Sequence, residues 1–320
     1  MNDQSMNGFA LAGSTKFSDP ERTLDGSARA HVPLIDLKTL WFNTGTLCNI
    51  ECANCYILSS PRNNALVYLT LDDVRPYLDE IRDRHFATTE IGFTGGEPFM
   101  NPQMIGLMEL ALDRGFDVLV LTNAMRPMMR PSVRRGLEHL WKTYGSRFTL
   151  RVSLDHYTAV HHDAERGKRS FEVTLQGMRW LSETGIRLAV AGRSIWNEDE
   201  EIARAGFQRL FDREGFSIDA SNPLDCVIFP EMDETVEVPE ITTACWDILG
   251  KRPEETMCAT SRMVVRRRGA EAPAVLSCTL LAYDAQFEMG KTLSDADRPV
   301  SLNHPHCAKF CVLGGAKCSG

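Results

Sequence analysis

The sequence predicts an α/β fold, in which a partial (β/α)6 barrel is followed by a small, irregular, cysteine-rich C-terminal extension. Strand-like and helix-like segments alternate about six times between residues 40 and 229, and the alternation ends near residue 230. Alternation of this kind implies right-handed crossovers and a parallel sheet. Because the count falls short of eight, a partial barrel fits better than a closed one.

Local sequence signals mark the expected elements of the barrel. Thr70 and Asp73 make a capping box at the start of one helix, and Gly115 follows the end of the next. The continuous apolar run at residues 117–122 is typical of a strand buried on both faces. The expected strands are residues 40–43, 90–94, 117–122, 148–154, 187–191, 216–220 and 226–229, and the expected helices are residues 70–86, 102–114, 132–144, 171–184 and 198–211.

The chain is expected to have three regions. Residues 1–36 are rich in Gly, Ser, Asp and Asn and predict a loosely ordered lead-in. Residues 37–230 form the barrel, and residues 231–320 form the extension, with one helix expected at residues 242–249. Since the extension has little apolar periodicity, we expect a metal centre to hold its shape.

Charge and hydropathy exclude two classes of partner. Lys and Arg number 35 against 43 Asp and Glu, a net charge of −8, so we expect no nucleic-acid partner. The basic run at residues 266–268 is interpreted as a solvated turn. No apolar run approaches the roughly 20 residues of a membrane helix, and residues 1–17 lack a secretion signal. We therefore expect a cytoplasmic protein that does not bind membranes.

The ten cysteines are unevenly distributed, and seven of them lie in the last third of the chain. Without a secretion signal, closely spaced cysteines indicate metal or redox chemistry rather than disulfides. Cys48, Cys52 and Cys55 follow the first expected strand, at the carboxyl edge where barrel enzymes build their sites. Three thiolates satisfy three irons of a four-iron cluster and leave the fourth open to a ligand, although a zinc site is possible on spacing alone.

A second motif favours the cluster over zinc. Gly95, Gly96 and Glu97 follow the second expected strand and are stiffened by Pro98. The two glycines allow a close approach of the backbone to a ligand, and Glu97 offers an acceptor for an ammonium group. Next to the cysteine loop, this segment can hold an amino acid moiety over the open iron.

Together the two motifs resemble the radical S-adenosylmethionine (radical SAM) superfamily. In that family a C-x3-C-x2-C loop follows the first strand of a partial, TIM-like (β/α)6 barrel, and Gly-Gly-Glu-Pro follows the second. The resemblance covers roughly residues 40–220. Other positions that look like family positions are Tyr56, Thr122, Asn123, residues 152–155 and residues 162–167.

The resemblance implies roles for individual residues. Cys48, Cys52 and Cys55 would ligate a catalytic [4Fe–4S] cluster, whose fourth iron S-adenosylmethionine would chelate. The residues implied in binding S-adenosylmethionine are Gly95, Gly96 and Glu97 for its amine, Ser153 for its ribose or carboxylate, Arg166 or Arg193 for its carboxylate, and Asn123. Ser153 and Arg166 could instead be a strand-end cap and a surface ion pair, and Asn123 a turn residue.

The resemblance also implies the reaction. The enzyme would reductively cleave S-adenosylmethionine to a 5′-deoxyadenosyl radical, which abstracts hydrogen from a small-molecule substrate for oxidation, epimerisation or rearrangement. A reducing partner such as flavodoxin or ferredoxin would supply the electron. We find no additional N-terminal module for capturing a leader peptide, and this favours a small substrate over the alternative, a precursor peptide. A noncatalytic iron–sulfur electron carrier is a third possibility, but such a carrier has no use for the Gly-Gly-Glu segment.

The C-terminal cysteines resemble the Twitch and SPASM extensions of the same superfamily, which carry auxiliary iron–sulfur clusters. The candidate ligands are Cys258, Cys278, Cys307, Cys311 and Cys318, with a small hairpin expected between the first two. Five cysteines suit one auxiliary [4Fe–4S] cluster, with Cys311 or Cys318 as the fourth ligand, and a structural zinc is the alternative. Cys226 is expected to be a small buried side chain, and Cys245 either the same or a further ligand.

Overall fold

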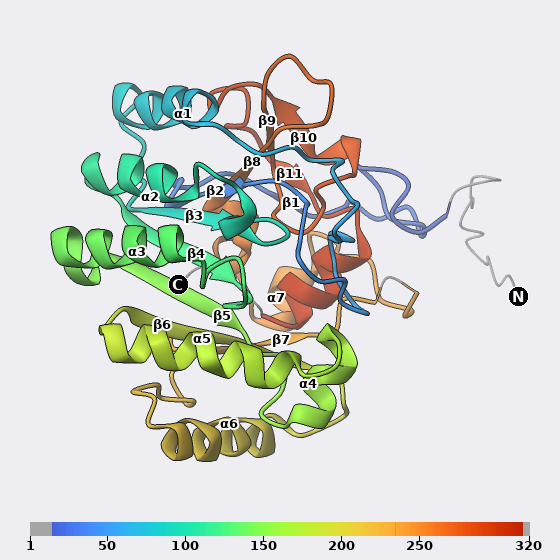
Figure 1. Ribbon diagram of the computed structural model, residues 1–320. Helices are drawn as coiled ribbons and strands as arrows, with labels where there is room; N and C mark the ends of the chain where they lie inside the picture. The colour runs from blue at the N-terminus through green and yellow to red at the C-terminus, as the bar shows by residue number, and fades with distance from the viewer. Residues whose placement is uncertain (1–14, 234, 316–320) are drawn as a thin grey trace, which may run out of the picture.

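Six parallel strands in chain order form the centre of the fold (Figure 1). The computed structural model describes residues 15–233 and 235–315. The strands are β2 (Thr39–Asn43), β3 (Glu90–Thr94), β4 (Asp117–Thr122), β5 (Phe148–Ser153), β6 (Arg187–Ser194) and β7 (Cys226–Pro230). The sheet stays open at β7, as expected of a partial barrel.

The parallel register brings the carboxyl ends of these strands together at one edge. Asn43 is opposite Thr94, and Thr122 is opposite Val152. The polar residues that follow the strands therefore gather at a single edge of the sheet. Active sites of parallel α/β folds form at this edge.

Helices connect the strands and lie along the outside of the sheet (Figure 1). They are α1 (Leu71–Asp83), α2 (Met104–Asp113), α3 (Pro131–Tyr144), α4 (Ala159–Arg166), α5 (Ser170–Thr184) and α6 (Glu200–Glu214). The capping box at the start of α1 is confirmed, because the Thr70 hydroxyl accepts a bond from the Asp73 amide while the Asp73 carboxylate accepts one from the Thr70 amide. None of the helices in the described part of the chain is long and apolar enough to cross a membrane.

The barrel differs from the prediction in two connections. Residues 216–220 are not a strand, although Phe216 and Ile218 are buried. The side-chain amide of Gln208 donates to the Ile218 carbonyl and accepts from the Ala220 amide. These side-chain hydrogen bonds take the place of those that a neighbouring strand would make. Helix α4 was not predicted, because His162 and Glu165, its two buried residues, give it no apolar stripe.

The C-terminal extension is more regular than its sequence suggests. Strand β8 (Ser261–Val265) pairs in parallel with β2, β9 (Ala274–Leu276) returns antiparallel to β8, and β10 (Glu288–Gly290) pairs with β9. The expected hairpin between Cys258 and Cys278 is thereby confirmed. Helix α7 (Cys245–Leu249) is shorter than expected. One hydrophobic core contains Leu40 of the barrel and Val264 of the extension, so it crosses the expected boundary at residue 230.

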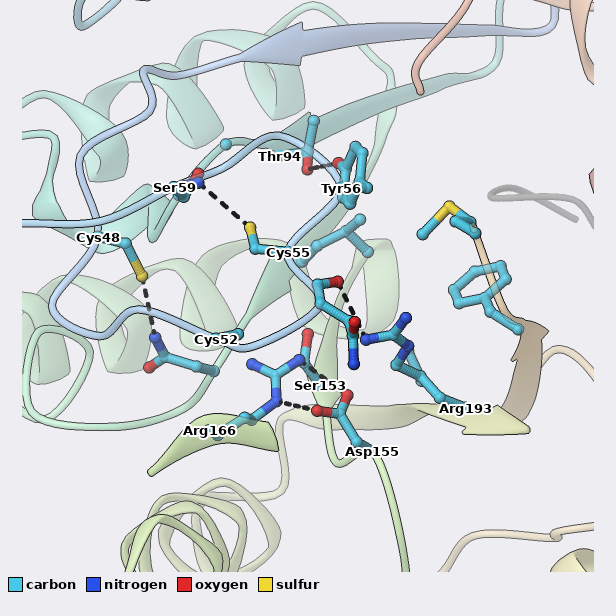
Figure 2. Close-up of a pocket in the computed structure, with 18 of the residues that line it drawn as sticks. Cys48, Cys52, Cys55, Tyr56, Ser59, Thr94, Ser153, Asp155, Arg166 and Arg193 are labelled. Atoms are coloured by element: carbon cyan, nitrogen blue, oxygen red, sulfur yellow. Dashed lines mark hydrogen bonds and ion pairs between the residues drawn. The ribbon is translucent and has the colours of Figure 1, made fainter. Parts of the chain in front are cut away.

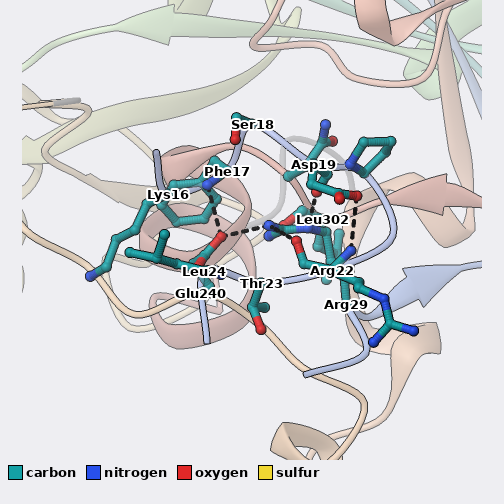
Figure 3. Close-up of polar contacts among 12 residues, drawn as sticks. Lys16, Phe17, Ser18, Asp19, Arg22, Thr23, Leu24, Arg29, Glu240 and Leu302 are labelled. Carbon is teal, nitrogen blue, oxygen red and sulfur yellow. Dashed lines mark hydrogen bonds and ion pairs between the residues drawn. The ribbon is translucent and has the colours of Figure 1, made fainter. Parts of the chain in front are cut away.

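The expectation of a loosely ordered lead-in is wrong for residues 15–36, whereas residues 1–14 lie outside the described part of the chain. Strand β1 (His31–Val32) pairs with β11 (Val300–Ser301) near the C-terminus. The buried Arg29 guanidinium forms an ion pair with Glu240 at 2.5 Å and donates to the Leu302 carbonyl (Figure 3). These contacts join residues more than two hundred positions apart, which local composition does not indicate.

The basic run at residues 266–268 is a solvated turn only at Arg268, which is exposed and begins a turn, whereas Arg266 and Arg267 are half-buried. Arg266 donates to both carboxylate oxygens of Asp73, at 2.8 and 2.9 Å. Arg267 forms an ion pair with Glu288, and Arg268 donates to Asn64. Ion pairs and hydrogen bonds to α1, β10 and the cysteine loop therefore hold the run in place.

Candidate active site

Cys48, Cys52 and Cys55 lie in the loop after β2 and line one cavity at the carboxyl edge of the sheet (Figure 2). The cavity measures about 1070 Å³, including the solvent at its mouth. The other expected site residues that line it are Gly95, Gly96, Asn123, Ser153, Arg166 and Arg193. The structure thus gathers in one place residues that are spread over about 150 positions of sequence.

The Gly-Gly-Glu segment packs directly against the start of the cysteine loop. The Gly96 amide donates to the Gly45 carbonyl at 2.8 Å, and the Glu97 amide to the Leu47 carbonyl at 3.1 Å. A Cβ atom on Gly95 would lie 2.5 Å from the Gly45 oxygen, and one on Gly96 would lie 2.3 Å from the Leu47 oxygen. Both positions therefore require glycine for contact between the two loops, in addition to any approach to a ligand.

The Glu97 carboxylate is turned into the protein interior and is absent from the described residues that line the cavity. It accepts hydrogen bonds from the Phe99 amide at 3.2 Å, the Thr122 hydroxyl at 2.9 Å and the Asn123 amide at 2.8 Å. Burial raises its pKa to about 7, although these donors favour the charged form. The carboxylate thus joins the ends of β3 and β4, whereas the sequence predicted that it contacts the amine of S-adenosylmethionine.

Asn123 connects Glu97 to the cysteine loop. Its amide nitrogen in the backbone is held by Glu97, and its side chain donates to the Asn49 side chain at 3.0 Å. The same Nδ2 atom lies 3.9 Å from the Cys48 sulfur. The position of Cys48 is therefore tied to the end of β4 through Asn123.

Two arginines line the cavity near the cysteine loop (Figure 2). Arg166 forms a two-point ion pair with Asp155, at 2.7 and 2.9 Å. Burial raises the pKa of Asp155, but the charge and hydrogen bonds of Arg166, together with the charge of Arg193, outweigh it and hold that pKa below its usual value. Arg193 donates through Nη1 to the Asn54 carbonyl at 3.1 Å and to Glu165 at 3.3 Å, and its buried Nε has no hydrogen-bond partner among the described residues.

Glu165 belongs to the site although the sequence did not single it out. Its carboxylate accepts from the Asn54 side chain at 2.7 Å and pairs with Arg193, and its carbonyl accepts from the Ala53 amide at 2.9 Å. Helix α4 is therefore hydrogen-bonded to the cysteine loop at the two residues between Cys52 and Cys55. The only signal in the sequence was the family-like stretch at residues 162–167, which contains it.

One end of the cavity is apolar and was also not predicted. It is lined by Phe229, Met232, Leu280 and Phe310. The rings of Phe229 and Phe310 stack with their centroids 5.6 Å apart. Since Leu280 and Phe310 belong to the C-terminal extension, the extension completes the wall of the barrel's cavity.

The thiols suit an iron–sulfur cluster once they are deprotonated. Burial raises the pKa of Cys48 to about 12 and also raises the pKa of Cys52. A bound cationic centre reverses this preference, because metal ligation requires thiolates and releases their protons. Among the described residues, no group of three or more His, Cys, Asp or Glu side chains converges closely enough to hold a single metal ion. Three thiols that line one cavity beside the Gly-Gly segment fit a cluster with a bound cosubstrate.

A second, smaller cavity of about 400 Å³ lies in the extension. It is lined by Cys258, Cys278, Cys307, Cys311 and His306, among other residues. Cys307 and Cys311 lie on η6 (Cys307–Leu313), a π-helix. Leu280 lines both cavities, so they are neighbours.

The remaining cysteines lie elsewhere. Cys318 falls outside the described residues. Cys226 is fully buried in β7, as expected. Cys245 is not among the described residues that line the second cavity, and its sulfur accepts a hydrogen bond from the Thr242 amide at 3.3 Å.

Comparison with known proteins identifies the family. The model of the radical SAM superfamily matches residues 42–209. The chain is 35% identical over 145 residues to the antilisterial bacteriocin subtilosin biosynthesis protein AlbA of Bacillus subtilis (45% of this chain, 30% of that protein). It is 27% identical over 158 residues to the mycofactocin maturase MftC of Mycobacterium tuberculosis (48% and 38%) and 30% identical over 162 residues to an AdoMet-dependent heme synthase of Methanosarcina barkeri (49% and 42%). The matches span less than half of each relative.

A solved structure supports the fold over a longer stretch. The crystal structure of Streptococcus suis SuiB bound to S-adenosylmethionine covers 80% of this chain and 63% of its own, with a TM-score of 0.58 and 12% sequence identity. The likeness extends beyond residues 42–209, so it includes part of the C-terminal extension. At this identity it is evidence of the fold alone.

The Glu97→Gln variant tests whether this carboxylate organises the loops. An amide cannot accept all three hydrogen bonds, because its NH2 group faces an N–H or O–H donor. We expect the free energy of unfolding of the chain without cosubstrate to fall by about 1–3 kcal/mol, as measured by urea denaturation. Glu109→Gln, at a half-exposed position of α2, is the control and should cost less than about 0.5 kcal/mol. Unchanged stability together with weaker binding of S-adenosylmethionine would instead indicate direct contact with the amine.

Proposed function

The chain belongs to the radical SAM superfamily, and we propose that within it the chain is an enzyme that modifies a peptide. The recognition from the cysteine and Gly-Gly-Glu motifs is confirmed, as is a cysteine-rich C-terminal extension in an α/β fold. The [4Fe–4S] cluster and S-adenosylmethionine expected from the sequence are the cofactors that this superfamily uses. The observation that carries the radical chemistry is the single cavity that the three thiols share with the Gly-Gly loop, and the peptide substrate rests on the similarity to the relatives.

Cys48, Cys52 and Cys55 would hold the catalytic cluster. Their common cavity supports this assignment, and so do the contacts of Glu165 and Arg193 with the intervening residues, because these contacts fix the loop. When bound, the cluster and S-adenosylmethionine supply the one-electron cleavage that yields a 5′-deoxyadenosyl radical for hydrogen abstraction. The chain itself positions the reactants and excludes water.

The rest of the cavity would bind S-adenosylmethionine. Gly95 and Gly96 would present their backbone to its amine, while Glu97 holds these glycines against the cysteine loop. Arg193 is better suited than Arg166 to take the carboxylate, because Arg166 is already paired at two points with Asp155 and the buried Nε of Arg193 has no partner in the described part of the chain. Ser153, at the end of β5, is within the same lining and could serve the ribose.

Cys258, Cys278, Cys307 and Cys311 would ligate one auxiliary [4Fe–4S] cluster. Their presence around one cavity supports Cys311 as the fourth ligand, whereas Cys318 lies outside the described residues. Four thiolates leave no iron open, so S-adenosylmethionine would not bind there. His306 lines the same cavity and lies next to Cys307, where it would border the cluster.

The relatives support a peptide substrate more than the small molecule expected from the sequence. The relative with 35% identity takes part in the biosynthesis of a bacteriocin, and another is a maturase. The apolar end formed by Phe229, Met232, Leu280 and Phe310 would receive an apolar side chain of the peptide. A small-molecule substrate remains the alternative, favoured by the likeness to an AdoMet-dependent heme synthase. In either case a one-electron donor, such as a flavodoxin or a ferredoxin in the cytoplasm, would reduce the cluster.

Substitution of the two sets of cysteines should separate the two clusters. The anaerobically reconstituted chain should contain about eight irons, of which the triple variant Cys48→Ala, Cys52→Ala, Cys55→Ala loses about half. The double variant Cys258→Ala, Cys278→Ala should lose the other half yet still form 5′-deoxyadenosine from S-adenosylmethionine, as quantified by chromatography. Wild-type iron content in the triple variant, or zinc in place of iron, would contradict the ligand assignment.

Co-expression tests the substrate class. We expect a short peptide encoded beside the gene for this chain to lose hydrogen atoms, or to form a new cross-link or epimerised centre, when it is co-expressed with the wild-type chain but not with the triple cysteine variant. Mass spectrometry and chiral amino acid analysis report these outcomes. A changed metabolite with every neighbouring peptide unaltered would support the small-molecule alternative and contradict the peptide proposal.

A further inference from the structure

Arg262, on β8, is buried, and its guanidinium lies within ion-pair distance of no carboxylate of the described residues, although the exposed Asp297 interacts with it electrostatically over a longer distance. The residue is 1% exposed. Its guanidinium donates to the carbonyl oxygens of Ala296 at 3.0 Å, Cys258 at 2.5 Å, Ser261 at 2.8 Å and Arg298 at 3.3 Å. It forms no ion pair with any residue in the described ranges. Since arginine keeps its proton inside proteins, the charge is present at neutral pH.

The buried Arg29 has a different environment. Arg29 also donates to backbone carbonyls near the second cavity, yet it pairs with the Glu240 carboxylate at 2.5 Å. Buried charges are costly unless an opposite charge or dense hydrogen bonding compensates them. Carbonyl oxygens satisfy the N–H groups of Arg262, but they leave its net charge in place.

The second cavity can supply a further negative charge. Arg262 donates to the backbone carbonyl of Cys258, and its guanidinium is close enough to interact electrostatically with thiolates at Cys258 and Cys278 as well as with Asp297. A four-iron cluster with four thiolates carries a net charge of about −2, which grows by one electron on reduction. No other buried arginine that contacts the backbone of a cysteine lining this cavity is found among the described residues.

We propose that Arg262 is the counter-charge of the auxiliary cluster, and that it raises the reduction potential of that cluster. The inference rests on the proposed auxiliary cluster at Cys258, Cys278, Cys307 and Cys311. A fixed positive charge stabilises the reduced form more than the oxidised form, because the reduced form is more negative. The effect is large in a buried site, where water does not screen it. In this proposal Arg262 acts by placing a fixed positive charge beside the auxiliary cluster, and it does not contact the substrate.

A purely structural role is the competing explanation. The four carbonyl bonds of Arg262 clasp the segment at Ala296 and Arg298 to the backbone of Cys258. Loss of this clasp would lower stability whether or not a cluster is bound, and it would not move a reduction potential in a fixed direction. A lysine at this position keeps the positive charge but lacks the planar guanidinium that binds several carbonyls at once. It therefore separates the electrostatic role from the structural role.

The test measures the midpoint potential of the auxiliary cluster by dithionite titration followed by electron paramagnetic resonance. The full-length chain carries Cys48→Ala, Cys52→Ala and Cys55→Ala, so that only the auxiliary cluster reports. Arg262→Gln removes the charge but keeps donors for the carbonyls, and Arg262→Lys keeps the charge. Arg266→Gln is the matched control, because Asp73 already neutralises Arg266.

We expect Arg262→Gln to lower the midpoint potential by at least a ten-fold change in the one-electron equilibrium, about 59 mV. In Arg262→Lys the midpoint potential should fall by less than half of that shift. In Arg266→Gln the midpoint potential should equal that of the parent chain. A potential in Arg262→Gln equal to that of the control, or an equal fall in Arg262→Lys, would overturn the inference and leave the proposed function intact. If Arg262→Gln does not fold, Arg262→Met provides the neutral variant. A parent chain that binds no auxiliary cluster would overturn both this inference and the second ligand set.

Discussion

The buried carboxylate of Glu97 is the interaction on which the site depends. A carboxylate in the interior must be surrounded by donors, and the donors available here come from Phe99, Thr122 and Asn123. These bonds fix the ends of β3 and β4 relative to each other. The Glu97 amide binds the Leu47 carbonyl, so the same residue also fixes the start of the cysteine loop. Glu97 does not face the cavity, yet it helps to fix the positions of the three thiols.

The two glycines before Glu97 have a related function. Any side chain at Gly95 or Gly96 would collide with the backbone at Gly45 or Leu47. The motif is thus a packing requirement between two loops as well as a surface for a ligand. This explains how two short segments, separated by about forty residues of sequence, can build one site.

The C-terminal extension is part of the same site rather than an appended module. Leu280 lies between the two cavities and lines both of them. The Tyr283 hydroxyl donates to the Ile57 carbonyl at 2.7 Å, which links the segment after Cys278 to the segment after Cys55. Strand β8 pairs with β2, so the two cysteine regions are also connected through the sheet. The two cysteine regions are therefore connected both through side chains and through the sheet.

The parts that the sequence predicted have local causes. The strands and helices of the barrel follow from capping residues and continuous apolar runs, as at Thr70 and residues 117–122. Cys48, Cys52, Cys55 and the two glycines were identifiable because their spacing is short and specific. The parallel sheet followed from the alternation of elements.

The parts that the sequence did not predict depend on distant partners. The direction of the Glu97 side chain is set by residues after β4, and the pairing of Glu165 with Arg193 joins a helix to a later strand. The lead-in is ordered by Glu240, more than two hundred residues away from Arg29. Residues 216–220 have the composition of a strand but receive their hydrogen bonds from Gln208.

The central claim is that the first cavity holds a cluster with one open iron. Its most direct test is the electron paramagnetic resonance spectrum of the reduced Cys258→Ala, Cys278→Ala variant, recorded with and without S-adenosylmethionine. The account predicts that the cosubstrate shifts the signal of the remaining cluster, because three thiolates leave one iron free to bind it. An unchanged spectrum, or a shift seen only in the variant that lacks Cys48, Cys52 and Cys55, would contradict the claim.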